Sequence, residues 1–408
     1  MRNHCTPCTA PTAPIRSGTP AFERAHEREE DRDDPPPPAL LEAAAMKAVY
    51  ATYRGLFADS PRAVYEGLRT RVPEGVEHVW LCNERTRPTF PGDVETVLYP
   101  SPEARAALES ADIVVANDCL SMPWSKRPDT TYLQTWHGTP LKRIHHDAPV
   151  REGWLDNADK DVARWDMLLS PNQVSTDRLR HAFGFAGPIH ETGYPRNDVL
   201  SSPDRDRIRA RVRAELGIPD GTTAVLYAPT WRDDLVFGGT GPDFEFPIDL
   251  GAFADRLGRD HVLLLRLHSM VKGRPSLDPD GPAIDVTDIA ESAGLYLAAD
   301  VLVTDYSSAM FDFAVTGKPI VFYTYDLEHY RDDLRGFYFD LAPIAPGPTV
   351  RTSNELIAEL AEIDVAVPEP TEAYARFRET FCALEDGHAT DRVLDLLLPP
   401  GRAATSSH

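Results

Sequence analysis

The sequence predicts an α/β protein with two Rossmann-like domains and a central cleft between them. Short apolar runs that are typical of buried strands alternate with stretches that carry helix start signals, and the alternation occurs in both halves of the chain. Near-continuous apolar strands separated by helices indicate parallel sheets that are covered on both faces. In such sheets, ligands bind beyond the carboxyl ends of the strands. Functional residues are therefore expected at strand ends.

The expected elements follow this pattern closely. The predicted strands are 78–83, 113–118, 131–136, 167–170 and 188–194 in the first half, and 224–230, 261–268, 300–305 and 319–324 in the second. The predicted helices include 101–110, a helix opened by Ser60 and Pro61, and helices near 250–257, 289–298 and 307–316. Ser101 and Pro102 supply an N-cap and a first-position proline to the helix that they open. The halves join near residues 195–220, which predicts domains at 39–200 and 201–400.

The start of the chain has a different composition. Residues 1–38 are small and polar, with the charged run EREEDRDD at 27–34 and four prolines at 35–38. Such a segment has too little apolar surface to offset its ordering entropy, so a disordered tail is expected. The remaining chain of this 408-residue, 42% hydrophobic protein is long enough to bury a large core.

Composition and charge also exclude several classes of protein. The sequence has no apolar run long enough for a secretory signal or a membrane span. We therefore expect a cytoplasmic protein, at most peripheral to the inner face of the cell membrane. The formal charge of -22 disfavours nucleic acid as a partner.

Two local features leave alternatives open. The basic patch at Lys142, Arg143, His145 and His146 is either a solvated loop or a contact for an anionic ligand. The pair CTPC at 5–8 resembles half of a zinc knuckle, but no second pair of ligands lies near it in the sequence. No metal site and no cofactor are therefore expected.

Polar side chains follow three of the apolar runs. His137 follows a predicted strand, Arg266 and His268 alternate at the end of another, and the third run leads into Ser307 and Ser308 at a predicted helix start. Alternation places Arg266 and His268 on one face of a strand. Imidazoles and a helix N-terminus at one crevice suit a phosphorylated substrate. General base help from an imidazole is typically worth about 100- to 10,000-fold in rate.

Five motifs resemble a known family. They are QTWHGTPLK (134–142), GYPRND (193–198), YAPTWRDD (227–234), RLHSMV (266–271) and TDYSSAMFDFAVTGKPIVFYTYDLEHY (304–330). In this order they resemble the CDP-glycerol glycerophosphotransferase family of teichoic acid polymerases, as does the upstream FADSPRAVYEGLRT (57–70). The resemblance covers roughly 50–340. It implies a two-domain glycosyltransferase fold of the B type (GT-B).

The resemblance also implies a reaction. It is the transfer of a polyol phosphate, glycerol phosphate or ribitol phosphate, from a CDP-activated donor to a hydroxyl of a cell-wall or capsular polymer, with release of CMP. The acceptor is a hydroxyl-bearing glycan that can be lipid-linked. His137 is then expected as the general base, because it follows a strand and precedes a turn that starts at Gly138. A histidine that only hydrogen-bonds inside its loop is the alternative.

The other site residues are assigned to the donor. Arg266 and His268 suit its pyrophosphate, unless they form a buried ion pair. Family resemblance implies that Ser307 and Ser308 contact donor phosphate and that Asp312 lies in the same pocket. We expect Asp312 to orient a hydroxyl or a cationic partner, because a carboxylate repels phosphate; a simple pair with Arg or Lys remains open.

Two more residues complete the expected site. Asp305 accompanies the serines, and Arg232 follows a strand end, where it suits an anionic donor or acceptor. Two other functions remain to be separated from the polyol-phosphate transferase. One is a sugar-nucleotide glycosyltransferase or epimerase, which would release UDP instead of CMP, and the other is a noncatalytic binding protein on the same scaffold.

Overall fold

The computed structural model describes most of the chain. The described residues are 45–149, 153–230, 232, 246–268, 276–279, 281–365 and 371–398. All of them belong to one compact unit that begins at Ala43. The predicted tail at 1–38 lies outside the described residues, as do parts of the YAPTWRDD and RLHSMV motifs.

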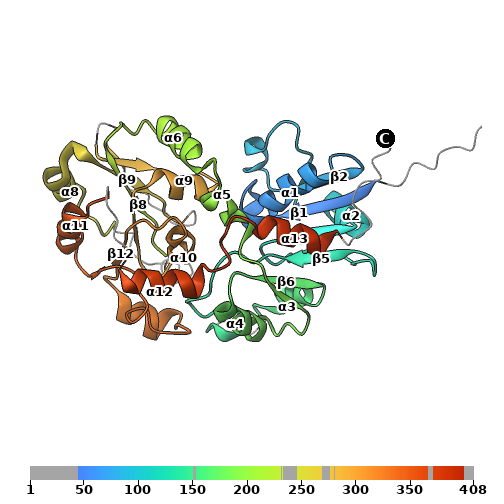
Figure 1. Ribbon diagram of the computed structural model, residues 1–408. Helices are drawn as coiled ribbons and strands as arrows, with labels where there is room; N and C mark the ends of the chain where they lie inside the picture. Colours follow the sequence, from blue (N-terminus) through green and yellow to red (C-terminus); the bar gives the residue numbers. More distant parts are fainter. Residues whose placement is uncertain are drawn as a thin grey trace, which may run out of the picture. The chain divides into compact units, whose positions relative to one another are not determined.

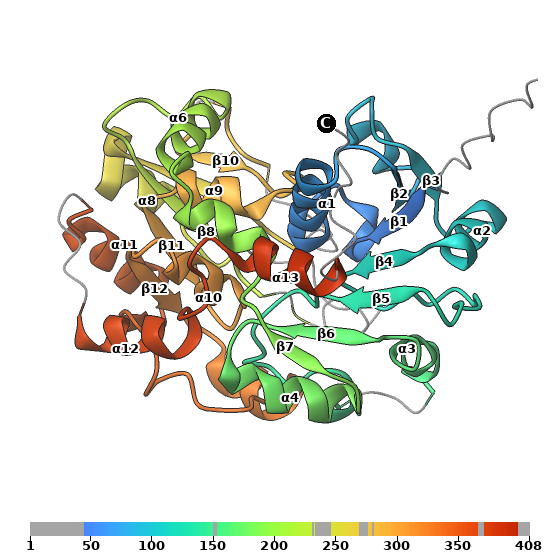
Figure 2. The same ribbon diagram turned by 45° about the vertical axis from the view of Figure 1, so that its right-hand side comes forward.

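In the described part of the chain, the first sheet has seven parallel strands in the order β3-β2-β1-β4-β5-β6-β7. They are β1 (Met46–Ala51), β2 (Val76–Cys82), β3 (Thr96–Leu98), β4 (Ile113–Ala116), β5 (Thr131–Gln134), β6 (Met167–Ser170) and β7 (Ile189–Glu191). Figure 2 shows them in this order. The strand order reverses between β1 and β4, which is the point at which doubly wound sheets bind ligands. We call this sheet and its helices the first lobe.

The second lobe repeats the arrangement. Its sheet has six described parallel strands in the order β10-β9-β8-β11-β12-β13. They are β8 (Thr223–Tyr227), β9 (His261–Leu265), β10 (Ala283–Asp285), β11 (Val301–Thr304), β12 (Ile320–Tyr323) and β13 (Thr349–Val350). Here the order reverses between β8 and β11. The loops after these strands form a second switch point.

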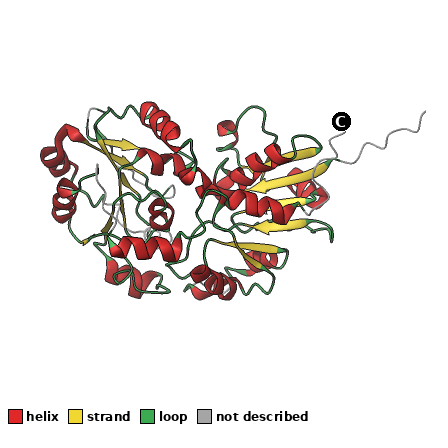
Figure 3. Ribbon diagram, viewed as in Figure 1, coloured by secondary structure: helices red, strands yellow, loops and turns green. Residues whose placement is uncertain are grey.

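Helices flank both sheets (Figures 1 and 3). The described α-helices are α1 (Asp59–Arg71), α2 (Pro102–Ser110), α3 (Asp156–Val162), α4 (Gln173–Phe183), α5 (Asp198–Ser201), α6 (Arg205–Glu215), α8 (Leu250–Leu257), α9 (Ser292–Ala298), α10 (Ala309–Ala314), α11 (Ser353–Glu362), α12 (Glu372–Phe381) and α13 (Ala389–Leu397). Short helical turns are η1 (Tyr53–Gly55), η2 (Arg87–Thr89), η3 (His145–Asp147), η4 (Pro195–Asn197), η5 (Gly258–Asp260) and η6 (His329–Leu334), the last a π-helix. None of the described helices combines the length and the apolar character needed to cross a membrane.

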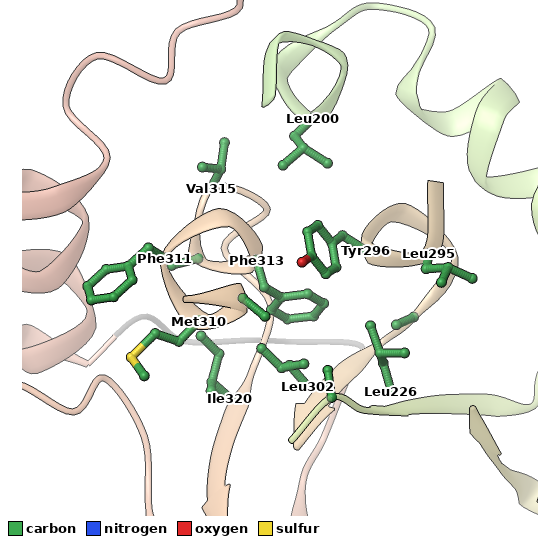
Figure 4. Close-up of a cluster of buried hydrophobic side chains, with 14 of the residues drawn as sticks. Leu200, Leu226, Leu295, Tyr296, Leu302, Met310, Phe311, Phe313, Val315 and Ile320 are labelled. Atoms are coloured by element: carbon green, nitrogen blue, oxygen red, sulfur yellow. The ribbon is translucent and has the colours of Figure 1, made fainter. Parts of the chain in front are cut away.

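The cores explain why the strand runs are continuously apolar. Along β1, Val49 packs into one cluster and Tyr50 into another, because successive side chains of a strand point to opposite faces. Along β8, Leu226 and Tyr227 are divided between two clusters in the same way. Figure 4 shows one of these clusters, in which Leu226 and residues of α9, α10 and neighbouring strands pack together. Both sheets are thus covered on both faces, as predicted.

The predicted strands and helices are largely present, although most of the strands end one or more residues before the predicted position. Four strands were not predicted: β1, β3, β10 and β13. The capping of α2 is confirmed, since the side chain of Ser101 accepts a hydrogen bond of 3.0 Å from the amide of Ala104. The predicted helix α1 is present, but Ser60 does not cap it: the N-cap is Ala58, and Ser60 is buried inside the first turn.

The last helix returns to the first lobe. Val393, Leu394 and Leu397 of α13 pack in the same cluster as Tyr50 of β1 and Val64 of α1. Figure 1 shows α13 beside α1 and β1, although α12 lies with the second lobe. The chain therefore crosses between the lobes twice, at η4 and before α13. The predicted domains, 39–200 and 201–400, assign α13 to the second domain, although α13 packs on the first lobe. These domain limits stay a prediction.

Candidate functional site

Loops from both lobes surround one cavity of about 480 Å³. The residues that line it follow the ends of β1, β2, β5, β8, β9 and β11, among them Tyr53, Asn83, His137, Pro229, Arg266, His268, Ser307 and Ser308. The cavity therefore adjoins the switch points of both sheets. Of the predicted site residues, the structure brings His137, Arg266, His268, Ser307, Ser308 and Asp312 together here.

The His137 ring is held by the backbone of the neighbouring strand end. Its Nδ1 atom lies 2.6 Å from the carbonyl oxygen of Asn117, just after β4. Because a carbonyl only accepts, Nδ1 carries the hydrogen, and Nε2 of the neutral ring keeps its lone pair. The side-chain oxygen of Asn117 also accepts a 2.7 Å hydrogen bond from the amide of Tyr53. Asn117 thus positions both His137 and the loop after β1.

The ring of Tyr53 lies near both predicted histidines. Its ring centroid is 6.0 Å from that of His137 and 6.4 Å from that of His268. Tyr53 comes from the first lobe and His268 from the second, so this ring contact joins the two lobes at the cavity. Tyr53 therefore lines the site, although the sequence analysis did not identify it as a site residue.

The backbone around these side chains is unusual. Arg54, Asp59 and Trp136 have φ values of 64°, 64° and 54°, although none of them is glycine. Left-handed φ values in non-glycine residues are uncommon, and they cluster at functional sites where the surrounding structure fixes them. Each of the three adjoins the cavity or a residue that lines it.

Arg266 and His268 follow the end of β9 at Leu265. Leu265 and Leu267 are buried while Arg266 and His268 line the cavity, so the predicted alternation is observed although the strand ends early. The Arg266 guanidinium donates to the carbonyl of Ile289 at 2.6 Å and to the hydroxyl of Ser292 at 2.8 Å. These acceptors are neutral, but Glu291 lies close enough to interact with the guanidinium charge, and it lines the same cavity. Burial lowers the pKa of Arg266 from its ordinary value.

Ser307 and Ser308 meet the His137 loop from the opposite lobe. An ideal Cβ placed on Gly138 would lie 2.7 Å from Oγ of Ser308, so only glycine allows this approach. Ser307 accepts a 3.3 Å hydrogen bond from the amide of Ala309. Ser308 is the N-cap of α10, but its side chain makes no capping bond.

Asp312 belongs to a buried ion-pair network beside the serines. Nη2 of Arg196 lies 2.9 and 3.1 Å from the carboxylate oxygens of Asp312, and Nη1 lies 3.2 Å from both oxygens of Asp59. Asn197 donates a further 2.9 Å hydrogen bond to Asp312. Asp59 starts α1 of the first lobe and Asp312 lies in α10 of the second. Arg196 therefore joins the lobes at the edge of the cavity, and it is the cationic partner of Asp312.

Burial and charge compete in this network. Burial favours the neutral form of Asp312 and raises its pKa, against the opposing effect of Arg196. For Asp59, burial is outweighed by Arg196 and the Ser60 amide, so the pKa lies below its ordinary value. Glu385 lies nearby and accepts a 3.1 Å hydrogen bond from the amide of Tyr194. Burial and the neighbouring Asp312 raise the pKa of Glu385 to about 8.

Arg232 and Asp305 do not line the cavity. Their Nη1 and Oδ2 atoms lie 2.9 Å apart, and Nε of Arg232 lies 2.6 Å from Asp326. The Arg232 guanidinium also lies over the rings of Tyr306, Tyr325 and Tyr330. Asp305 accepts the amide of Thr230 at 2.7 Å. The two residues thus form a buried pair that holds the ends of β8 and β11, and their contact with a ligand stays a prediction.

Several residues of the site were missed by sequence reasoning. Arg196 and Asn197 stand in the GYPRND motif, which was used for the resemblance only, and Asp59 stands in the upstream FADSPRAVYEGLRT segment. Tyr53 and Asn117 follow strand ends, so a prediction of β1 would have identified Tyr53 as a candidate. Glu385 carries no sequence signal, because its burial depends on the return of α13.

The cavity lining offers no group of three metal-ligating side chains within the described part of the chain. A second cavity of about 900 Å³ shares Asp59, Arg196, Ile289 and Glu291 with the first. None of the predicted site histidines and serines lines this larger cavity. The smaller cavity is therefore the candidate active site.

Comparisons with known proteins agree with this arrangement. Residues 41–399 match the family described as CDP-Glycerol:Poly(glycerophosphate) glycerophosphotransferase. The chain is 38% identical over 354 residues to a teichoic acid glycerol-phosphate transferase of Staphylococcus aureus (strain NCTC 8325 / PS 47), covering 83% of this chain and 88% of the relative. It is 35% identical over 360 residues to a teichoic acid poly(glycerol phosphate) polymerase of Bacillus subtilis (strain 168), covering 85% of this chain and 48% of the polymerase. The chain thus spans about half the length of this polymerase.

Solved structures give the same result. The wall teichoic acid polymerase TagF matches with a TM-score of 0.78 and 35% sequence identity, over 86% of this chain and 88% of that one. A histidine variant of TagF soaked with CDPG matches equally well. A UDP-GlcNAc 2-epimerase of Methanocaldococcus jannaschii has a TM-score of 0.50 at 12% identity, over 86% of this chain and 100% of that one, which shows a shared fold alone. The predicted GT-B type of fold is confirmed.

Proposed function

Because the chain belongs to the CDP-glycerol:poly(glycerophosphate) glycerophosphotransferase family, we propose that it transfers glycerol phosphate from CDP-glycerol to a hydroxyl of a cell-wall polymer. The family resemblance found in the sequence is thereby confirmed, together with the prediction of a transferase of this family. Glycerol phosphate is favoured over ribitol phosphate because the two relatives named above are glycerol-phosphate enzymes. We expect the enzyme to act in the cytoplasm, where a lipid-linked acceptor would bring it to the inner face of the membrane.

One observation carries the proposal: a histidine from each lobe faces the same cavity. Nε2 of His137 has its lone pair, because Nδ1 donates to Asn117. The acceptor hydroxyl would give its proton to this nitrogen while its oxygen attacks the phosphorus that bears glycerol. The bond between that phosphorus and the bridging oxygen breaks, and its electron pair leaves with CMP.

The second lobe provides the groups for the donor. His268, Arg266, Ser307 and Ser308 line the cavity from the second lobe. Donors and a guanidinium suit the negative charge that develops on the phosphates as CMP leaves. Asp312 is held by Arg196, so its role here is to fix the position of α10 rather than to contact phosphate.

A panel of donors tests the proposal. The full chain is incubated with CDP-glycerol, CDP-ribitol or UDP-GlcNAc and a glycerol phosphate acceptor, and the liberated nucleotide is measured. We expect release of CMP from CDP-glycerol in proportion to the product formed. Release of UDP from UDP-GlcNAc alone would support the sugar-nucleotide alternative. Binding of CDP-glycerol without turnover would support the noncatalytic alternative.

A further inference from the structure

A cluster of His145, His146 and Asp159 lies outside the candidate active site. The first two residues belong to η3, within the basic patch of the sequence, and Asp159 belongs to α3. One ligand atom from each of the three side chains lies within 4.8 Å of the others. Two imidazoles and one carboxylate are a ligand set that zinc takes when a fourth position is left to water.

His145 gives independent evidence for a ligand at this cluster. Its side chain is only 6% exposed, and Nε2 is buried without a hydrogen-bond partner among the described residues. A buried polar atom is seldom left unsatisfied, so such an atom requires an explanation. Nε2 lies 3.9 Å from Oδ1 of Asp159, which is too far for a hydrogen bond but leaves space for an ion between them.

The ring of His145 is oriented as a metal ligand would be. Its Nδ1 lies 3.1 Å from the carbonyl oxygen of Ala182, so Nδ1 carries the hydrogen and Nε2 presents a lone pair toward Asp159. Histidine ligands commonly donate their second nitrogen to a backbone carbonyl, which fixes the tautomer. Phe183 packs beside the ring with its centroid 4.7 Å away.

The other two side chains can adjust to an ion. Nε2 of His146 lies 2.8 Å from Oδ1 of Asp159, and both side chains are about half exposed. Zinc bonds of about 2.0–2.2 Å to nitrogen and oxygen place tetrahedral ligands roughly 3.3 Å apart. The observed distances of 2.8 and 3.9 Å bracket this value. Small rotations of the exposed side chains therefore suffice, while His145 stays in place.

We propose that His145, His146 and Asp159 bind a Zn²⁺ ion whose fourth ligand is water. Imidazole nitrogens favour zinc over Mg²⁺, which prefers oxygen. The ion would join η3 to α3. The loop that begins at His137 leads into η3, so an ion at η3 would also hold the far end of this loop. There, Asp147 of η3 accepts a 2.6 Å hydrogen bond from Tyr338 of the second lobe. This site is separate from the catalytic cavity and does not depend on the proposed reaction.

Zinc binding to the full chain tests the proposal directly. The protein is stripped with a chelator and titrated with Zn²⁺ against a chromophoric competitor, with Mg²⁺ as the control ion. We expect one equivalent of Zn²⁺ to bind and to raise the melting temperature, and Co²⁺ to give the visible spectrum of a tetrahedral site. The variants His146→Ala and Asp159→Asn should weaken binding by at least about tenfold, because each removes a ligand.

Two control variants separate this site from other ligands. His181→Ala removes a nearby exposed histidine that pairs with Asp147 at 2.6 Å and is outside the cluster; it should bind Zn²⁺ normally. Cys5→Ser combined with Cys8→Ser removes the cysteine pair of the CTPC segment, and it should also bind normally. The proposal is overturned if the wild type binds no stoichiometric Zn²⁺. It is also overturned if the cysteine variant loses the ion while His146→Ala keeps it.

Discussion

Gly138 and Ser308 touch beside the candidate active site, and their approach is closer than any side chain at residue 138 would allow. An added Cβ would lie 2.7 Å from Oγ of Ser308 and 2.9 Å from its Cβ. Rotation of the serine side chain can move Oγ but not Cβ. The contact therefore sets the distance between the loop that carries His137 and the loop that carries the serines.

The Gly138→Ala variant should reduce turnover while leaving the protein folded. A methyl group displaces the serine loop relative to His137, and a misplacement of about 1 Å can lower the rate roughly 100-fold. The measurement is kcat/KM for CMP release, with circular dichroism as the control for folding. Combining Gly138→Ala with Ser308→Gly removes the clash. The double variant should then be less impaired than the product of the two single effects predicts, and simple additivity would contradict the contact.

Donor affinity should depend on His268 and Ser307. Both line the second-lobe side of the cavity, so His268→Ala and Ser307→Ala should each weaken binding of CDP-glycerol in a calorimetric titration. Their effects should be coupled in the double variant, because the groups surround one ligand. His329→Ala, an exposed histidine beside Asp333, serves as the matched control and should bind normally. Unchanged donor affinity in both single variants would exclude this pocket as the donor site.

Arg196 should be important for stability as well as for the site. Replacement by methionine leaves Asp59 and Asp312 buried without their partner, which should cost about 3–5 kcal/mol of unfolding free energy. Arg71→Met removes a more exposed arginine that pairs with Asp391 and should cost under about 1 kcal/mol. Urea unfolding measures both. An equal loss of unfolding free energy in the two variants would show that the buried network stabilises the protein no more than an exposed ion pair does.

How much of this could be predicted depends on the type of signal. His137, His268 and the serines follow strongly apolar strands, so the sequence placed them at strand ends, and the parallel topology brings them together. The partner of Arg232 could not be predicted from its position after a strand. A guanidinium after a strand end suits either an anionic ligand or a neighbouring carboxylate, and only the fold shows that Asp305 and Asp326 are adjacent.

The missed elements have physical reasons of their own. β3, β10 and β13 are two or three residues long, so they show no periodicity. The residues of β1 form an apolar run, but this run follows soon after the polar, proline-rich tail and was therefore not predicted as a strand. Contacts between residues far apart in the chain, such as that of α13 with α1 or of Glu385 with Tyr194, leave no local pattern. Such contacts depend on the path of the chain between the lobes.

Stability should fall as the pH rises through the neutral range. The pKa of Glu385 is raised from an ordinary 4.5 to about 8, so between these values the folded protein holds a proton that the unfolded chain has lost. This contribution is fully present below about pH 4.5 and is lost toward pH 8, at up to about 1.4 kcal/mol per pH unit.

The Glu385→Gln variant removes the titration, since glutamine keeps the acceptor for the Tyr194 amide without a charge. Its unfolding free energy should therefore vary less between pH 5 and 8 than that of the wild type. Glu362→Gln, on the exposed part of α11, is the matched control and should keep the wild-type slope. The same slope in all three proteins would refute a proton on Glu385.

The central claim is that His137 accepts the proton of the acceptor hydroxyl, and single-turnover CMP release from CDP-glycerol by His137→Ala tests it most directly. Loss of a general base predicts a rate lowered by about 100- to 10,000-fold, with donor affinity and melting temperature close to those of the wild type. His181→Ala, an exposed histidine outside the cavity, should release CMP at the wild-type rate. A folded His137→Ala protein with a rate within a few-fold of the wild type would contradict the account.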